Sequence, residues 1–342
     1  MVKSTCSEHI NLASNSQFDT FQIGIALNAT LYRKSILIAL AGELGAGKTT
    51  LTKGIAQGLG IAEAILSPTY AIENRYDNLL LHMDLYRLEE KEAQRIVTES
   101  EDFPGVRVIE WSERLFSSFE ENGIAITIAE LSATDRTITI LFNDIAIPDR
   151  VQIEAWREEM KLPTHIGKHC DAVAVMARKL GEELIRRGKP VRLMALTRAA
   201  ELHDLLRFID FKPEVQKKIP HAKAADAETQ LHWDRIKKQY PASHETACAS
   251  FITEQGYPEI GAIIRPHGLH AMTDAPESIQ TIEQKLLNYA DKRVKYDVEV
   301  SLDERFDDFM DRYGNGKESE WAKLARKRTK ELEKELFGNN IP

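Results

Sequence analysis

The spacing of hydrophobic and polar residues along this chain follows two different patterns, and the pattern changes near residue 148. In the first part, short apolar runs rich in β-branched residues alternate with helical patterns. The runs predict strands at 35–40, 106–111, 124–130 and 136–142, and two more within 70–86 that turn at Asp77-Asn78. Helical spacing predicts helices over 16–31 and 49–61. Strands mixed with helices in this way predict an α/β domain.

From Val151 onward the pattern is helical, with almost no strand-like segment. Its apolar stripes predict helices over 151–160, 169–188, 191–208, 244–255, 277–297 and 318–336. We place the boundary at Pro148, which gives a first domain over 1–148, an all-α second domain over 149–300 and a C-terminal helical tail over 301–342. The tail carries Trp321, Leu324, Leu332 and Leu336 on a partial stripe, which predicts a docking or surface helix. Its many lysines and glutamates favour the second, because such charge is typical of a solvated helix face.

The composition narrows the class of protein. With 342 residues the chain is long enough for two domains, and its 43% hydrophobic and 29% charged residues are typical of a soluble protein. The net charge of −8 argues against binding nucleic acid through bulk electrostatics. Cys6, Cys170 and Cys248 form no CxxC pair and suit a reducing compartment. The N-terminus lacks a signal-peptide layout and the apolar run 35–42 is too short to cross a bilayer, so we expect a cytoplasmic protein with no membrane partner.

A phosphate-binding loop follows the predicted strand at 35–40. The segment GELGAGKT fits the pattern G-x-x-x-x-G-K-[ST], with a strand before it and a helix after it. Its glycines let backbone N–H groups turn toward phosphate oxygens, and the helix adds its positive N-terminal end. Lys48 is expected to reach the β- and γ-phosphates and Thr49 to hold Mg²⁺. The predicted nucleotide-binding residues are Gly42, Glu43, Leu44, Gly45, Ala46, Gly47, Lys48, Thr49 and Thr50.

Two acidic residues end apolar strands at the place where a P-loop domain needs a carboxylate for Mg²⁺. Glu110 ends the run VRVIE and Asp84 ends the run LLLHMD. A strand-end carboxylate that faces only solvent explains each of them equally well, so the pattern alone leaves both interpretations open.

The order of four motifs closely resembles the TsaE family, small ATPases that assist the formation of threonylcarbamoyladenosine in tRNA. The motifs are GELGAGKTTLTKGIAQGLGI, SPTYAIENRY, LLHMDLYRL and VIEWSER, and the resemblance spans about residues 17–148. It implies that Lys48 and Thr49 bind ATP and Mg²⁺. Because family members work with transferase subunits, it also implies TsaB/TsaD-like partners and, indirectly, tRNA.

The same resemblance assigns roles to four residues outside the loop. It implies that Thr69 of SPTY lies in a switch-like loop and that Trp111 lies near the nucleotide. Asp84 and Glu110 are implied to be the catalytic acid and the metal-side acid.

The dipeptide His203-Asp204 lies on the apolar face of the predicted helix 191–208. The preceding apolar residues of LMALTRAA define that face, and both polar residues fall on it or beside it. Because an unpaired buried carboxylate is expensive, a buried aspartate beside a buried histidine favours a compensating cation. Taken alone, however, such a dipeptide is common, and it more often marks a histidine that merely packs in a core than a metal ligand.

Four other segments each bring a histidine or an aspartate to an apolar helical face. With the dipeptide they make five such segments, and core packing alone explains so many poorly. The candidate metal ligands are therefore His169, His203, Asp204, His244, His267 and Asp291.

This series resembles the HD-domain phosphohydrolase superfamily, a helical fold, over about residues 163–297. The resemblance implies four core ligands, which are His169, His203, Asp204 and Asp291. It implies that His244 and His267 serve a second metal position, with Asp204 bridging the ions and acting in catalysis. Imidazole and carboxylate donors together suit Mn²⁺, Fe or another first-row divalent ion. Such ions lower the pKa of bound water and neutralise a phosphate oxygen, which implies in-line hydrolysis of a phosphoester.

The sequence departs from many HD relatives directly after the dipeptide, where it reads HDLLR in place of HDIGK. Arg207, about one turn after His203, is placed either to contact a substrate phosphate or to form a surface salt bridge. This departure bears on which substrate class the domain accepts more than on whether it binds metal.

The expected architecture is an α/β P-loop NTPase-like domain followed by an all-α HD domain. This architecture favours a bifunctional enzyme, in which an ATPase supports tRNA modification and a phosphohydrolase acts on a phosphorylated small molecule or nucleotide. In one alternative the helical domain is a non-catalytic sensor that binds a nucleotide or a metal and regulates the ATPase. In another, the chain is a nucleic-acid end-repair kinase and phosphatase, against which the acidic net charge and the four motifs argue.

Overall fold

The computed structural model describes residues 7–115, 122–212, 224–313 and 319–342, so Cys6 lies outside the described residues. The chain forms two compact units, which are described separately below. The first unit comprises residues 1–146 together with 184–192, and the second comprises 147–183 and 193–342. Residues 184–192, which the sequence grouped with the helical domain, thus pack with the first unit.

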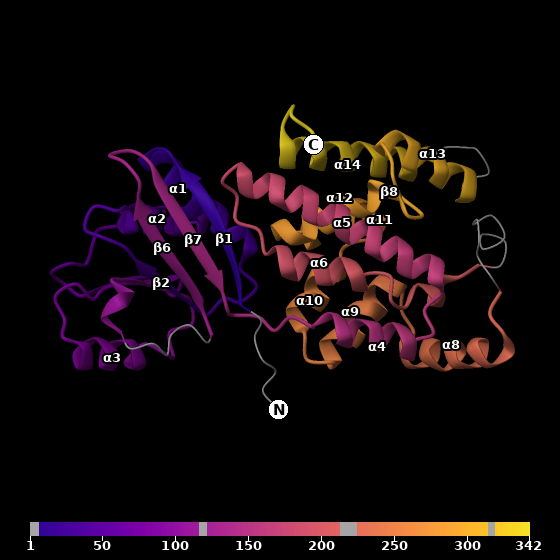
Figure 1. Ribbon diagram of the computed structural model, residues 1–342, viewed down its shortest axis with the longest axis horizontal. Helices are drawn as coiled ribbons and strands as arrows, with labels where there is room; N and C mark the ends of the chain where they lie inside the picture. The colour runs from indigo at the N-terminus through magenta and orange to yellow at the C-terminus, as the bar shows by residue number, and fades with distance from the viewer. Residues whose placement is uncertain (1–6, 116–121, 213–223, 314–318) are drawn as a thin grey trace. The chain divides into compact units, whose positions relative to one another are not determined.

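A seven-stranded mixed sheet forms the first unit (Figure 1). Its strands in spatial order are β1 (Glu8–Ser14), β7 (Arg136–Phe142), β6 (Ile124–Glu130), β2 (Ile36–Ala41), β5 (Val106–Glu110), β4 (Leu80–Asp84) and β3 (Glu73–Tyr76). Strand β2 is parallel to β5 and β6, and β4 is parallel to β5, whereas the outer pairings are antiparallel. The predicted strands and the turn at Asp77-Asn78 are confirmed. Strand β1, with its alternating burial, was not predicted.

Helices cover both faces of this sheet. Helices α1 (Gln17–Leu27) and α2 (Lys48–Gly58) contribute to the apolar cluster on one face, and α3 (Glu90–Glu99), which was not predicted, contributes to the cluster on the other. Helices α1 and α2 approach closely at two glycines. A Cβ on Gly24 would lie 2.4 Å from the carbonyl oxygen of Leu51, and one on Gly54 would lie 2.1 Å from that of Phe21. Glycine is therefore required at this crossing.

The second unit is helical apart from one short hairpin. Its helices are α4 (Arg150–Glu159), α5 (Thr164–Arg186, whose last residues belong to the first unit), α6 (Leu193–Leu202), α8 (Ala227–Gln239), α9 (His244–Glu254), α10 (Pro258–Ile264), α11 (Leu269–Thr273), α12 (Ile282–Lys292), α13 (Leu302–Tyr313) and α14 (Glu320–Phe337). The hairpin pairs β8 (Val294–Lys295) with β9 (Val298–Glu299). The helical character of this region is confirmed. Helices α8, α11 and α13 were not predicted. The segment EIGAIIRPHG was expected to carry His267 on a helical face, but α10 ends at Ile264 and His267 lies beyond it.

Two of the predicted helices are shorter in the structure. The helix predicted over 191–208 ends at Leu202, so His203 and Asp204 lie in a turn and not on the helix. The backbone tightens there, because Leu205 N–H bonds the carbonyl of Leu202 and Leu206 N–H bonds the sulfur of Cys248. Leu202, Leu205 and Leu206 are all buried, so the apolar periodicity of the sequence continues past the end of the helix. The helix predicted over 277–297 likewise divides into α12 and the hairpin.

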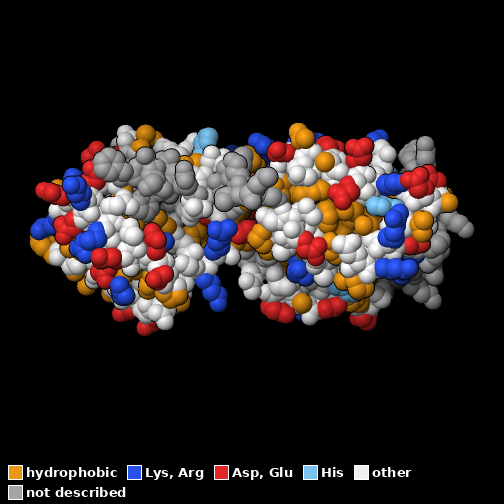
Figure 2. Space-filling view, turned by 90° about the horizontal axis from the view of Figure 1, so that it is seen from below, with side chains coloured by type: hydrophobic (Ala, Val, Ile, Leu, Met, Phe, Trp, Pro, Cys, Tyr) orange, Lys and Arg blue, Asp and Glu red, His pale blue; other side chains and the backbone are white. Residues whose placement is uncertain are grey.

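The C-terminal helix α14 is amphipathic. Leu332, Leu336 and Phe337 are buried in the second unit, next to residues of α11, α12 and α13. The expectation of a solvated helix therefore holds only for its charged side. Figure 2 shows acidic and basic side chains interspersed over the visible face of each unit. Among the described residues, no helix has the length and apolarity that crossing a bilayer requires.

Candidate functional site

The predicted phosphate loop of the first unit joins β2 to α2 with the backbone that such a loop needs. Gly42, Gly45 and Gly47 all have positive φ angles, of 145°, 88° and 111°. A Cβ at Gly42 would also lie 2.6 Å from the carbonyl oxygen of Ile128, so no larger residue fits. Helix α2 begins at Lys48 without a side-chain cap, which leaves its positive N-terminal end directed at the loop.

The side chain of Lys48 folds back over this loop. Its Nζ donates to the carbonyl oxygens of Gly42 and Glu43, the latter at 3.0 Å, and lies 3.6 Å from the ring centre of Trp111. Burial lowers the pKa of Lys48, while nearby carboxylates, led by Glu110, oppose that shift. Carbonyl oxygens are weaker partners for an ammonium than phosphate oxygens are, so a triphosphate would compete for this group.

Glu110, at the end of β5, is buried and bonded at both carboxylate oxygens. Thr49 Oγ1 lies 3.0 Å from Glu110 Oε2, and His82 Nε2 lies 2.8 Å from Glu110 Oε1. The interpretation of Glu110 as a carboxylate that faces only solvent is therefore wrong. A hydroxyl beside a carboxylate at a helix N-terminus is an oxygen donor pair of the kind that Mg²⁺ prefers. The sequence reasoning missed His82, although the alternation of LLHMD places it on the same face as Asp84.

Asp84 lies opposite Glu110 across the parallel pair β4–β5. Thr69 Oγ1 donates to its Oδ2 at 2.7 Å, and the backbone N–H of Tyr86 donates to its Oδ1 at 2.9 Å. Because Asp84 is 4% exposed, it too is not a carboxylate that faces only solvent. Trp111 follows Glu110 in a left-handed conformation (φ 65°), and its ring lies 4.7 Å from that of Tyr86. The loop residue Thr69 thus connects directly to the acid at the strand end.

We call Lys48, Thr49, Asp84 and Glu110 the strand-edge centre. The remaining predicted nucleotide-binding residues lie around it. Glu43 and Leu44 are exposed, Ala46 is buried, and Thr50 Oγ1 accepts a bond from Gln17 of α1 at 3.3 Å. Arg136, which the sequence reasoning missed, donates to the carbonyl of Ala46 at 2.7 Å and so braces the loop from strand β7.

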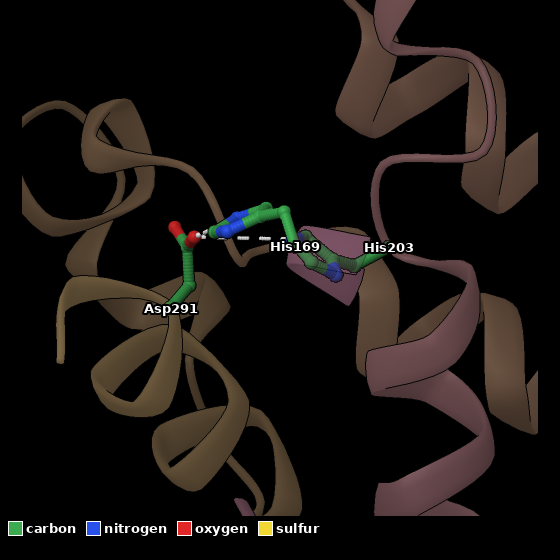
Figure 3. A group of neighbouring side chains, drawn as sticks. All are labelled: His169, His203 and Asp291. Atoms are coloured by element: carbon green, nitrogen blue, oxygen red, sulfur yellow. Dashed lines mark hydrogen bonds and ion pairs between the residues drawn. The ribbon is translucent and has the colours of Figure 1, made fainter. Parts of the chain in front are cut away.

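The candidate ligands of the second unit come together in one buried group, the histidine cluster, made up of His169, His203, Asp204, His244, His267 and Asp291. Figure 3 shows one side of it, where His169 from α5 and His203 both approach Asp291 of α12. His169 Nε2 lies 3.1 Å and His203 Nε2 3.8 Å from Asp291 Oδ1.

Asp204 is the centre of the other side of the cluster. His244 Nε2 lies 3.0 Å and His267 Nε2 3.6 Å from Asp204 Oδ1, while His203 Nε2 lies 3.9 Å from Asp204 Oδ2. His203 therefore lies between the two carboxylates. This arrangement offers donor atoms to one ion near Asp291 and to a second near Asp204.

The outer nitrogen of each histidine is held by a group that accepts a hydrogen bond. His169 Nδ1 donates to the carbonyl of Tyr296 at 2.7 Å, and the carbonyls of Ala200 and Ile264 accept from His203 and His267 in the same way. For His244 the partner is the carboxylate of Asp210, at 2.6 Å. Bonds of this kind fix the tautomer and direct each Nε2 inward, as in metal-binding histidines. Tyr296 has a positive φ of 57°, a strained conformation within the β8–β9 turn.

One inward nitrogen has no hydrogen-bond partner. His203 is fully buried, and its Nε2 has no partner within hydrogen-bonding distance among the described residues. A buried polar atom without a partner costs free energy, so this nitrogen fits a metal ligand better than a residue that only packs. The donor set of imidazoles and carboxylates suits a first-row divalent ion.

Charged residues around the cluster keep its carboxylates ionised. Burial by itself raises the pKa of Asp204, but His203, Arg207 and His244 outweigh that effect and hold it well below its ordinary value. Burial also raises the pKa of Asp291, and the adjacent Lys292 and His169 lower it well below its ordinary value. Carboxylates that stay ionised are the form that binds cations.

Arg207 lies at the edge of the cluster. Its Nη1 is 2.9 Å from His244 Nε2 and its Nε is 3.8 Å from Asp204 Oδ2, with 29% of the side chain exposed. Arg207 therefore forms a partly exposed ion pair with Asp204, and its contact with a substrate phosphate stays a prediction. Two further neighbours, Asp210 and Glu245, were missed by the sequence reasoning, because nothing in a helical pattern marks them.

The first unit is similar in sequence to known proteins. Residues 14–138 match the family model described as threonylcarbamoyl adenosine biosynthesis protein TsaE. A protein of that name from Treponema pallidum is 39% identical over 135 residues, which cover 37% of this chain and 96% of the relative. One from Bacillus subtilis is 35% identical and is covered to 73%, with 33% of this chain matched.

A relative from Nostoc, also named tRNA threonylcarbamoyladenosine biosynthesis protein TsaE, is 45% identical over 104 residues. That match takes in 28% of this chain and 64% of the relative, so the chain spans somewhat less than two thirds of the Nostoc protein. The crystal structure of Bacillus subtilis YdiB aligns with 41% of this chain and 89% of its own, at 28% identity and a TM-score of 0.33.

Proposed function

The chain belongs to the TsaE family, and from this premise we propose that its first unit is an ATPase that supports the formation of threonylcarbamoyladenosine in tRNA. The observation that carries the proposal is the strand-edge centre, where the loop lysine, the helix threonine and two strand-end carboxylates meet. TsaB/TsaD-like transferase subunits are the partners that such an ATPase serves, and tRNA is reached through them.

Each residue of the strand-edge centre has a distinct part in this proposal. Lys48 leaves its carbonyl partners to bind the β- and γ-phosphate oxygens of ATP. Thr49 and Glu110 hold Mg²⁺, and bound Mg²⁺ neutralises charge on the phosphates. Asp84, held by Thr69 and the Tyr86 N–H, orients the attacking water at the strand end. Trp111 covers the lysine from the side.

ATP hydrolysis by purified full-length protein tests the proposal. We expect Lys48→Ala to reduce the rate on the order of 100-fold or more, because the triphosphate loses its cation. Lys53→Ala is the matched control, since Lys53 lies on the same helix and is exposed. An unchanged rate of ATP hydrolysis in Lys48→Ala would overturn the ATPase proposal.

For the second unit we propose a metal-dependent phosphohydrolase with the HD fold, acting on a phosphorylated small molecule or nucleotide. The supporting observation is the inward direction of the Nε2 nitrogens, each held from behind by an acceptor on Nδ1. The core ligands in this proposal are His169, His203, Asp204 and Asp291. His244 and His267 serve a second ion on the Asp204 side. Ions of this class, Mn²⁺ or Fe, supply acidified water and charge neutralisation for a phosphoester when bound.

The chain's own residues provide the remaining functions. Asp204 keeps its negative charge within reach of both halves of the cluster. Arg207, partly exposed beside it, binds a phosphate oxygen of the substrate.

Metal content measured on protein purified without chelator or affinity metal tests this second proposal. We expect close to two equivalents of a transition metal in the wild type and a loss in Asp204→Ala, with Asp234→Ala, an exposed position on α8, as control. One equivalent would support a mononuclear site, with His244 and His267 as substrate contacts. No metal after reconstitution with Mn²⁺ or Fe²⁺ would overturn the proposal in favour of a non-catalytic sensor.

The end-repair alternative makes a separate prediction. A kinase–phosphatase pair transfers phosphate from ATP to the 5′-hydroxyl of an oligonucleotide. We expect no such transfer, and observing it in wild type but not in Lys48→Ala would replace our assignment of the first unit.

A further inference from the structure

His82 is a buried histidine that the proposed mechanism of the first unit does not use. It lies in β4, two residues before Asp84, so both side chains point to the sheet face that α2 covers. Its neighbours on that face of β4 and β5, Leu80 and Val108, are apolar. The side chain of His82 is fully buried.

Among the residues that the structure describes, the side-chain partner of His82 is Glu110. Its Nε2 lies 2.8 Å from Glu110 Oε1. His82 pairs in register with Val108, so Glu110 is its diagonal neighbour across the two strands, at a separation that long side chains span. An ionised carboxylate only accepts hydrogen bonds, which places the imidazole proton on Nε2.

This bond leaves the other ring nitrogen unsatisfied. His82 Nδ1 is buried and has no hydrogen-bond partner among the described residues. A polar atom in that state costs free energy, and an apolar side chain among Leu80 and Val108 would avoid the cost. A role in packing therefore does not explain the histidine, whereas a role toward Glu110 does.

Glu110 has a second oxygen, and the bond from His82 determines what that oxygen can do. While His82 holds Oε1, Oε2 is directed at Thr49 Oγ1, 3.0 Å away. Thr49 and Glu110 are the two residues that hold Mg²⁺ in the proposed ATPase. Without His82, the Glu110 carboxylate loses the contact that fixes its rotation and the direction of Oε2.

We propose that His82 is a positioning residue of the ATPase: it holds Glu110 so that one carboxylate oxygen faces Thr49 and the Mg²⁺ bound with ATP. The inference rests on the proposed function of the first unit. A positioning role differs from a stabilising role in one respect. Loss of His82 then affects the Mg²⁺-dependent binding of the nucleotide, and not the nucleotide contacts made by Lys48 and the loop.

The test is equilibrium binding of a fluorescent ATP analogue to the full-length chain, titrated with Mg²⁺ and repeated in EDTA. We expect His82→Leu to weaken Mg²⁺ in the ternary complex by about 10- to 100-fold, the usual effect of removing a partner of a metal ligand. Affinity in EDTA stays within about 3-fold of wild type. His82→Gln, whose amide reaches the place of Nε2, restores most of the Mg²⁺ affinity. His9→Leu, an exposed position on β1, is the control.

A second measurement separates positioning from packing. In a Glu110→Gln background, adding His82→Leu changes Mg²⁺ affinity no further, because the two residues act through one contact. If His82→Leu does not fold, His82→Asn takes its place, since that amide is too short to reach Glu110. An equal loss in EDTA and in Mg²⁺, or full Mg²⁺ affinity in the folded variant, would overturn the inference. Failure of wild type to bind the analogue at all would instead overturn the proposed ATPase.

Discussion

The strand-edge centre of the first unit takes its residues from the start of helix α2 and the ends of two adjacent strands, whereas the histidine cluster takes its residues from three separate helices and two turns. In the first unit, the sheet register alone brings Asp84 opposite Glu110. In the second unit, nothing local brings His169 to Asp291, which lies 122 residues further along the chain. Both centres nevertheless contain functional groups that a hydrogen bond holds from behind: His82 bonds Glu110 in one, and backbone carbonyls accept from His169 and His203 in the other.

The helix starts show the same contrast. Helix α2 begins at the phosphate loop with Gly47 as its N-cap and without a side-chain cap, which keeps its N–H groups for a ligand. Helix α12, which carries Asp291, begins with a capping box between Thr281 and Gln284. In this pair, the helix that starts at the phosphate loop has no side-chain cap, and the helix that carries Asp291 near its other end has one.

The largest effect is expected from the buried ion pair that joins residues 184–192 to the first unit. Arg192 bonds both oxygens of Asp144, at 2.6 and 2.9 Å, and both side chains are about 1% exposed. Arg192→Met leaves a buried carboxylate unpaired and lowers the free energy of unfolding of the first unit by about 3–5 kcal/mol. Calorimetry that resolves the two units measures this as a loss confined to one transition.

The matched control for that variant is Arg75→Met. Arg75 pairs with Glu73 at the surface, where such pairs contribute at most about 1 kcal/mol. If Arg192→Met lowers the transition temperatures of both units equally, the units do not unfold independently. Their stabilities then cannot be compared separately.

A pair of carboxylate variants distinguishes the two centres by their activities. We expect Asp84→Asn to reduce ATP hydrolysis on the order of 100-fold or more, since the variant loses the carboxylate that orients the attacking water, while the metal content stays unchanged. Asp291→Asn has the reverse effect, a loss of bound metal with normal ATP hydrolysis. Coupled losses in either variant would show that the centres are not independent.

A smaller effect is expected behind the histidine cluster. Asp210→Asn removes the carboxylate that holds His244 Nδ1, so metal affinity falls by about 10- to 100-fold. Competition with a chromogenic chelator measures the affinity, and Asp234→Asn serves as the control. An unchanged affinity would mean that His244 needs no orienting partner and would weaken the parallel with His82.

The smallest effect concerns the capping box of α12. Thr281→Ala removes the side chain that accepts from Gln284 N–H and costs about 1 kcal/mol of stability in the second unit. Metal affinity changes little, because Asp291 lies near the other end of the helix. A large loss of metal in this variant would show that the start of the helix also positions its ligand.

The chain by itself determined the elements that depend on neighbouring residues. The loop GELGAGKT and the apolar runs that end at Asp84 and Glu110 are local patterns, so the phosphate loop and the strands other than β1 follow from the sequence. The candidate metal ligands were also found, because each is a polar residue in an apolar pattern. The end of α6 was not, since buried Leu205 and Leu206 continue the pattern past the turn that holds His203.

Only the tertiary structure decided which groups hold the functional residues in place. The carbonyl of Tyr296 at His169, the carboxylate of Asp210 at His244 and the imidazole of His82 at Glu110 all act across elements. Residues 184–192 pack with the first unit, where Arg192 forms an ion pair with Asp144, 48 residues away. Such contacts depend on three-dimensional packing, which leaves no periodic trace along the chain, whereas a loop or a strand face does.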